Sequence, residues 1–146
     1  DPASTIIHEF KISSQENSRV LKLVPLLSFS TIQKSIEYQN ISIIKIDTEG
    51  AEFEVMESLT EMIKSTKPII ILEVWHNNGE PFKIARTKKL SDLVHFLNYT
   101  VFSWNVTEKK PYYTDFQEAQ LGEHSSDNYV LAPHEKKEDL KKILST

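Results

Sequence analysis

The stretch that decides the fold is Ile43-Ile-Lys-Ile-Asp-Thr-Glu-Gly-Ala-Glu52. Its first residues belong to a run of apolar and mostly β-branched residues, Ile41–Ile46, which predicts a strand buried on both faces of a parallel sheet. The run ends in Asp47, and apolar residues then recur at helical spacing through Glu49–Ser65 until Pro68. In open α/β sheets, ligands bind beyond the carboxyl ends of the strands, so chemistry is expected at Asp47.

A second apolar run, Ile69–Trp75, predicts the next buried strand, and it too ends among polar residues, Glu73 and His76. If the two strands are neighbours, four side chains converge on one rim of the sheet. The candidate site residues are therefore Asp47, Glu49, Glu73 and His76. Within the turn, Gly50 is expected to allow close backbone approach or an unusual dihedral angle.

Several of these residues also have a purely structural interpretation. Glu49 and Glu52 could serve only to stabilise the start of a helix through its dipole. Asp47 is harder to explain in this way, because a carboxylate at the end of a buried strand needs a partner or a function. Lys45 is a candidate partner, since the alternation of a strand places it one pleat away on the same face. His76 could be a structural loop residue.

Further elements are predicted on both sides of this junction. In chain order they are a hairpin of Thr5–Ile12 and Arg19–Ser28, a helix at Thr31–Tyr38 capped by Ser30, a helix at Lys88–Leu97, a strand at Thr100–Asn105, a connection at Val106–Asp127, a strand at Asn128–Ala132 and a helix at Glu135–Leu144. From residue 41 onward the alternation of strands and helices predicts an α/β fold with a mostly parallel sheet. We expect one domain over residues 1–146, with a hairpin in residues 1–29 and an α/β core in residues 30–146.

Composition excludes several classes of protein. The net charge of −4 argues against a nucleic-acid binder, and the basic runs Arg86–Lys89 and Lys136–Lys142 are interpreted as solvated helix faces. The absence of cysteine excludes disulfides, thiolate metal sites and a cysteine nucleophile. No apolar stretch reaches the length of a membrane span. A cytoplasmic location is favoured, while sequons at Asn40, Asn98 and Asn105 leave the secretory pathway open.

The junction also carries a family resemblance. Ile44-Lys-Ile-Asp-Thr-Glu-Gly-Ala-Glu52, with Pro68-Ile-Ile-Ile-Leu-Glu-Val74 after it, resembles the FkbM family of S-adenosylmethionine-dependent methyltransferases. The fixed letters of the family motif I-D-x-E-G-x-E are matched by Ile46, Asp47, Glu49, Gly50 and Glu52. The resemblance covers roughly residues 20–132, with departures at Phe29-Ser30, where the family usually has Leu-Asp, and at Ser58, where glycine is common.

This resemblance implies a Rossmann-like methyltransferase fold and transfer of a methyl group to a hydroxyl, often of a sugar or natural product. It implies that Asp47 and Glu49 line the acceptor side of the site and that Glu73 closes the rim. The partner would be a small-molecule or glycan hydroxyl acceptor. Asp47 or His76 would act as a base, or Asp47 would only orient the hydroxyl.

A glycine-rich cofactor turn is missing from the sequence. Such folds hold S-adenosylmethionine with glycines after the first strand, yet none of the three glycines, Gly50, Gly79 and Gly122, precedes residue 50. We therefore expect the C-terminal half of a Rossmann-like domain, truncated and inactive alone. Without a first strand beside it, the strand 41–46 would present an apolar edge that the hairpin, the missing half or self-association must cover.

Two alternatives belong to other functional classes. The chain could be a non-catalytic binding or scaffold module, with Tyr112, Tyr113 and Phe116 in the long connection as its interaction surface. It could also be a hydrolase in which the rim carboxylates and His76 bind Mg, Ca or Mn, since these metals prefer oxygen ligands.

Overall fold

A five-stranded sheet forms the centre of the part of the chain that the structure, a computed structural model, describes: residues 27–74, 79–105, 115–122 and 128–144. The strands are ordered β1-β2-β5-β3-β4. Their bounds are β1 Ile43–Ile46, β2 Ile69–Glu73, β3 Tyr99–Asn105, β4 Asp115–Glu118 and β5 Asn128–Pro133. The α/β class predicted from the sequence is confirmed, whereas the predicted hairpin falls almost entirely outside the described residues.

The sequence predicted a mostly parallel sheet, and this prediction was wrong. Among the described strands only β1 and β2 pair in parallel, while β5 pairs antiparallel with both β2 and β3, and β4 pairs antiparallel with β3. The strand–helix–strand segment from β2 to β3 does carry the chain back in the same direction. However, β5 inserts between those two strands from the opposite direction, which alternation along the sequence could not reveal.

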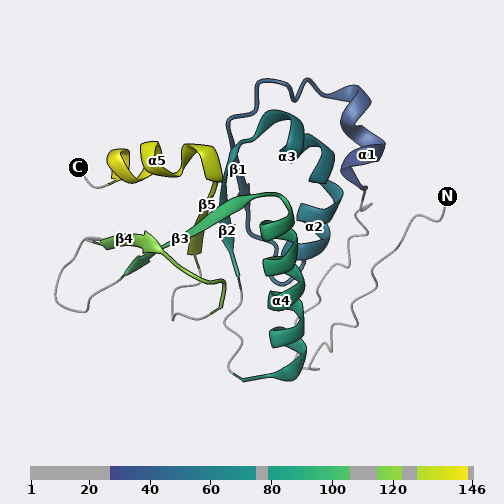
Figure 1. Ribbon diagram of the computed structural model, residues 1–146. Helices are drawn as coiled ribbons and strands as arrows, with labels where there is room; N and C mark the ends of the chain where they lie inside the picture. Colours follow the sequence, from purple (N-terminus) through teal and green to yellow (C-terminus); the bar gives the residue numbers. More distant parts are fainter. Residues whose placement is uncertain (1–26, 75–78, 106–114, 123–127, 145–146) are drawn as a thin grey trace, which may run out of the picture.

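Helices cover both faces of this sheet (Figure 1). In chain order they are α1 Phe29–Ile32, the 3₁₀ turn Gln33–Ser35, α2 Glu52–Ser58, α3 Thr60–Thr66, α4 Pro81–Phe96, the 3₁₀ turn His134–Lys136 and α5 Lys137–Leu144. The larger core lies between the sheet and helices α2, α3 and α4, and includes Met56, Ile63 and Leu90. On the other face, Leu140 of α5 packs against a smaller cluster around Phe102. No helix among these residues is both long and apolar enough to span a membrane.

Several predicted helix boundaries were wrong. The helix expected at residues 31–38, with Ser30 as its cap, begins at Phe29 after Ser28 and ends at Ile32. The single helix expected at residues 49–65 begins at Glu52 and is interrupted at Leu59. A side-chain hydroxyl next to that break competes with backbone N–H groups for a helix carbonyl. Ser58 Oγ donates to the Val55 carbonyl at 2.8 Å.

Other boundaries moved outward. Helix α4 begins at Pro81 rather than Lys88, because proline is compatible with the first helical position, where no intrahelical N–H bond is needed. The connection expected at residues 106–127 contains the strand β4, and the helix expected from Glu135 begins as a 3₁₀ turn at His134. Helix α4 packs into the core through Leu90 and Val94, which are both 2% exposed.

Strand β1 lies at one end of the described sheet and is less buried than predicted. Ile46 is buried, but Lys45 is exposed and Ile43 is 63% exposed. The apolar run had suggested burial on both faces. Its strand instead has one described neighbour, β2, and α5 covers the other face of the sheet near β5 rather than near β1. The predicted apolar edge is therefore present in the described residues.

Candidate functional site at the end of β1

The carboxyl ends of β1 and β2 form one rim, as the sequence predicted. The two strands are parallel neighbours with Ile46 opposite Leu72, so continuing the register places Asp47 beside Glu73. Glu49 follows in the exposed turn after Asp47. His76, the fourth candidate, lies outside the described residues. Three of the four predicted side chains thus come from segments that end at the same edge of the sheet.

Lys45 and Asp47 form an ion pair along the face of β1. Nζ of Lys45 donates to Oδ2 of Asp47 at 2.5 Å, with the two side chains 56% and 36% exposed. The hydrogen bond from Lys45 to Asp47 raises the pKa of Lys45, and the negative charge of Glu73 raises it further. The predicted partnership is confirmed, and the charge effect is consistent with Glu73 being close to the same rim.

The turn after β1 places two successive residues at positive φ. Glu49 has φ of 55° and Gly50 has φ of 106°. Glycine tolerates such angles because it lacks a Cβ, whereas a glutamate in the left-handed region carries a conformational cost. The expectation of an unusual dihedral angle at Gly50 is confirmed, and Glu49 shares it. Surrounding contacts must therefore hold this turn in place.

Glu52 provides one of those contacts. It is 6% exposed, and its Oε1 accepts hydrogen bonds from the Gly50 backbone N–H at 2.8 Å and from Thr48 Oγ1 at 3.1 Å. The sequence suggested a charge at the start of a helix, and Glu52 is indeed the first residue of α2. Its buried carboxylate has a more specific task, because it fixes the peptide group between Glu49 and Gly50.

Arg86 provides the opposite contact, and the sequence analysis missed it. From α4, Nη2 of Arg86 donates to the Gly50 carbonyl at 2.5 Å and forms an ion pair with Glu54 of α2. We had interpreted residues 86–89 as a solvated helix face. Lys88 and Lys89 are exposed, but the side chain of Arg86 is only 24% exposed. No local signal identifies it, because its partners lie more than 30 residues earlier in the chain.

The turn at Gly50 does not supply a backbone cradle for S-adenosylmethionine. Such a cradle uses backbone groups of a glycine-rich turn to approach the ligand. Here the Gly50 N–H is bonded to Glu52 and its carbonyl to Arg86, so both backbone groups of the turn already have partners within the chain. The rim offers carboxylates, which can accept hydrogen bonds from the hydroxyl groups of a ligand.

No grouping of three or more acidic, histidine or cysteine side chains suited to a metal ion occurs within the described segments. The hydrolase alternative therefore gains no support from Asp47, Glu49 and Glu73. His76, which that alternative also used, lies outside these segments.

Comparison with known proteins gave one match. The family model described as the methyltransferase FkbM domain matches residues 3–125, which include the whole junction and both strands of the rim. Searches of the curated proteins and of the solved structures each found no match.

Proposed function

This chain belongs to the FkbM methyltransferase family, and from that premise we propose that it takes part in methyl transfer from S-adenosylmethionine to a hydroxyl group. The acceptor is a small molecule or a glycan. The rim formed by Asp47, Glu49 and Glu73 is its acceptor side. The observation that carries this proposal is the parallel pairing of β1 and β2, which brings the motif carboxylates to one edge of the sheet.

Asp47 has the central role in this proposal. Its Oδ2 accepts a hydrogen bond from Lys45, and the carboxylate has further lone pairs with which to accept a hydrogen bond from the acceptor hydroxyl. S-adenosylmethionine, when bound, would supply an already activated methyl group, so the contribution of Asp47 would be to orient the acceptor hydroxyl. Either Asp47 or His76 removes the proton of the acceptor hydroxyl. The pH dependence of methyl transfer in variants of Asp47 and His76 distinguishes the two.

We further propose that the described sheet is the second half of a Rossmann-like methyltransferase sheet, with β1 bordering the first half. Two observations support this: β1 ends the described sheet with Ile43 exposed, and the sequence has no glycine before Gly50. The 146-residue chain alone should then bind S-adenosylmethionine weakly and be inactive. The alternative of a scaffold module depends on Tyr112, Tyr113 and Phe116, whose side chains the structure does not describe, and no observation favours it.

The test compares the 146-residue chain with the longest natural polypeptide that contains it. Each is incubated with radiolabelled S-adenosylmethionine and a panel of methyl glycosides and small alcohols. We expect label in at least one acceptor for the longest polypeptide and background label for the 146-residue chain. Asp47→Asn should lower transfer about 100-fold, whereas the exposed-charge control Lys88→Gln should not change it.

Three results would contradict the proposal at different points. A longest polypeptide that neither binds the cofactor nor transfers label removes the methyltransferase function. Full transfer by Asp47→Asn removes the role of the rim. Tight one-to-one binding of S-adenosylmethionine to the 146-residue chain in calorimetry removes the assignment to the second half of the fold.

A further inference from the structure

We propose that Arg86 is a positioning residue for methyl transfer, because it fixes the turn from which Asp47 and Glu49 reach the acceptor. This inference rests on the proposed function of the rim. Arg86 itself does not touch the acceptor in this proposal. It acts through the backbone of Gly50, on a segment far from it in sequence.

The contacts of Arg86 join three elements. One guanidinium nitrogen, Nη2, donates both to the Gly50 carbonyl in the turn and to the Glu54 carboxylate on α2, while Arg86 itself is on α4. The side chains of Arg86 and Glu54 are 24% and 29% exposed, so water screens this pair less than it screens a surface pair. Charge-assisted hydrogen bonds of this kind are roughly twice as strong as neutral ones.

The geometry of the turn makes this contact important. The Gly50 N–H belongs to the peptide plane between Glu49 and Gly50, and Glu52 holds that plane. The Gly50 carbonyl belongs to the next plane, between Gly50 and Ala51, and Arg86 holds that one. Glycine would otherwise rotate freely between several backbone conformations. Because both planes are fixed, the turn has one backbone conformation. That conformation sets the orientation in which Asp47 and Glu49 project from the end of β1.

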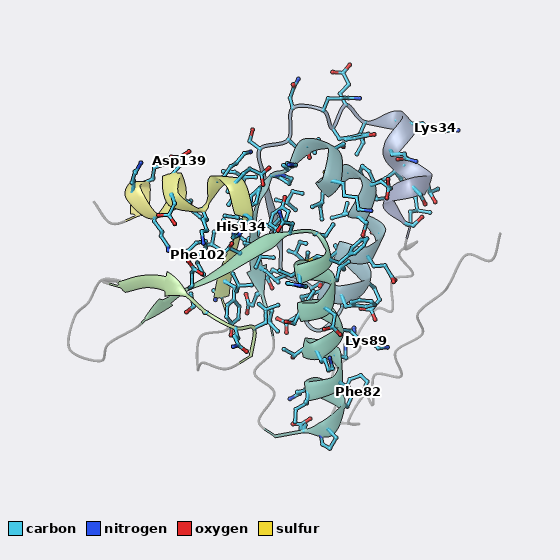
Figure 2. All side chains as sticks on the ribbon, viewed as in Figure 1. Lys34, Phe82, Lys89, Phe102, His134 and Asp139 are labelled. Atoms are coloured by element: carbon cyan, nitrogen blue, oxygen red, sulfur yellow. The ribbon has the colours of Figure 1, made fainter. Side chains whose placement is uncertain are left out.

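Phe82 supports the same interaction from the outer side. Its ring centroid lies 5.5 Å from Cζ of Arg86, which is within the range of a cation–π contact. Phe82 precedes Arg86 by one helical turn, and Figure 2 shows Phe82 and Lys89 projecting from the same side of α4. Lys89 in turn lies over the Phe53 ring of α2 at 5.9 Å. Two residues of α4, Arg86 and Lys89, therefore contact α2.

The same helix provides a matched control. Lys88 forms an ion pair with Asp92 at 3.2 Å, but the side chains are 74% and 67% exposed and both lie on α4. Removing Lys88 therefore removes a positive charge close to Arg86 in sequence without removing any contact with the turn.

The first experiment measures kinetics of the methyl-transferring polypeptide with Arg86→Gln, Glu54→Gln and Lys88→Gln. We expect Arg86→Gln to lower kcat at least about tenfold with little change in the KM for S-adenosylmethionine, because a misplaced rim affects the chemical step. Glu54→Gln, which leaves the Gly50 bond in place, should lower kcat less, and Lys88→Gln should leave it unchanged. Wild-type kcat in Arg86→Gln, or an equal loss in Lys88→Gln, would overturn the inference.

The second experiment uses the 146-residue chain and does not depend on activity. Amide hydrogen exchange by NMR should become about tenfold faster in Arg86→Gln at Gly50, whose N–H is bonded to Glu52, relative to the core amide of Leu72. In Lys88→Gln the exchange at Gly50 should match the wild type. If Arg86→Gln does not fold, Arg86→Lys, which keeps the positive charge but lacks the guanidinium group, gives the same comparison with a smaller effect. Unchanged exchange at Gly50 in the folded Arg86 variant would show that Arg86 does not hold the turn.

The two experiments separate the possible failures. A wild-type polypeptide without transfer activity overturns the proposed function, and the exchange data still decide whether Arg86 fixes the turn. Active wild type with unaffected Arg86→Gln overturns the positioning role alone.

Discussion

Two turns enclose the helices α2 and α3, and each places a non-glycine residue in the left-handed region. Before α2, Glu49 has φ of 55°, and after α3, Lys67 has φ of 47°. In both turns a basic side chain from a distant segment donates to a backbone carbonyl. Arg86 bonds the Gly50 carbonyl, and Lys136 bonds the Lys67 carbonyl at 2.9 Å.

In the turn at Lys67, both the backbone and the Lys67 side chain have partners elsewhere in the structure. Its backbone N–H donates to the Ile63 carbonyl at 2.9 Å, and its side chain forms an ion pair with Glu135. The following Pro68 carbonyl accepts a buried hydrogen bond from Tyr99 Oη at 2.9 Å. These contacts tie the end of α3 to the start of β3 and to the 3₁₀ turn after β5.

The turn at Glu49 has a similarly restrained backbone but a different set of side chains. Asp47 and Glu49 remain exposed at the carboxyl end of the strands, which is where open α/β sheets bind ligands. The two turns therefore share a left-handed residue and a restrained backbone. They differ in place, because only the turn at Glu49 follows the carboxyl end of a strand.

The largest effect on this comparison is expected from Gly50→Ala. A Cβ at φ of 106° is strained, so the free energy of unfolding should fall by about 1–3 kcal/mol in urea denaturation. Methyl transfer by the longest polypeptide should fall as well. Gly79→Ala is the control, since its φ is 78° and an added Cβ meets nothing within 4 Å. If both variants reduce methyl transfer equally, the conformation of Gly50 does not position the rim carboxylates.

Tyr99→Phe should break the other turn. It removes the donor to the Pro68 carbonyl and should lower the free energy of unfolding by about 1 kcal/mol without changing transfer. Loss of transfer without loss of stability would contradict the purely structural role of the Lys67 turn.

The same variant tests a pH dependence. Burial, and secondly the charge of Glu135, raises the pKa of Tyr99 well above its ordinary value. The unfolded chain therefore loses the phenol proton at about pH 10, while the folded protein keeps it. The free energy of unfolding falls as the pH rises above that value. We expect the stability advantage of the wild type over Tyr99→Phe to shrink between about pH 8 and about pH 11. An advantage that grows over this interval would contradict the assignment.

A matched pair of glycine substitutions should have smaller effects on stability. Glu49→Gly and Lys67→Gly both relieve a left-handed conformation and both add backbone entropy to the unfolded chain, so each should change the free energy of unfolding by less than about 1 kcal/mol. Only Glu49→Gly should reduce methyl transfer. Equal transfer by the two variants would mean that the Glu49 side chain has no part in the reaction.

The smallest effect concerns Lys45. Asp47→Asn removes the carboxylate that raises the pKa of Lys45, so NMR titration should show this pKa returning toward its ordinary value. Global stability should change little, because exposed ion pairs contribute about 0–1 kcal/mol. Asp92→Asn, which removes an exposed carboxylate on α4, should leave the pKa of Lys45 unchanged.

The sequence by itself determined the local features of this protein. The apolar run before Asp47, the positive φ at Gly50 and the partnership of Lys45 with Asp47 all follow from short-range periodicity and residue chemistry. The motif that matches the family also lies within one continuous stretch, so its recognition needed no tertiary information.

Only the tertiary structure decided how distant segments meet. It placed β5 between β2 and β3, left β1 at the end of the described sheet, and brought Arg86 to the Gly50 carbonyl. Pairing partners and contacts of this kind depend on which surfaces bury one another, and similar patterns of apolar residues are compatible with several arrangements. For that reason the carboxylates of the rim could be predicted from the sequence, while the arginine that holds their turn could not.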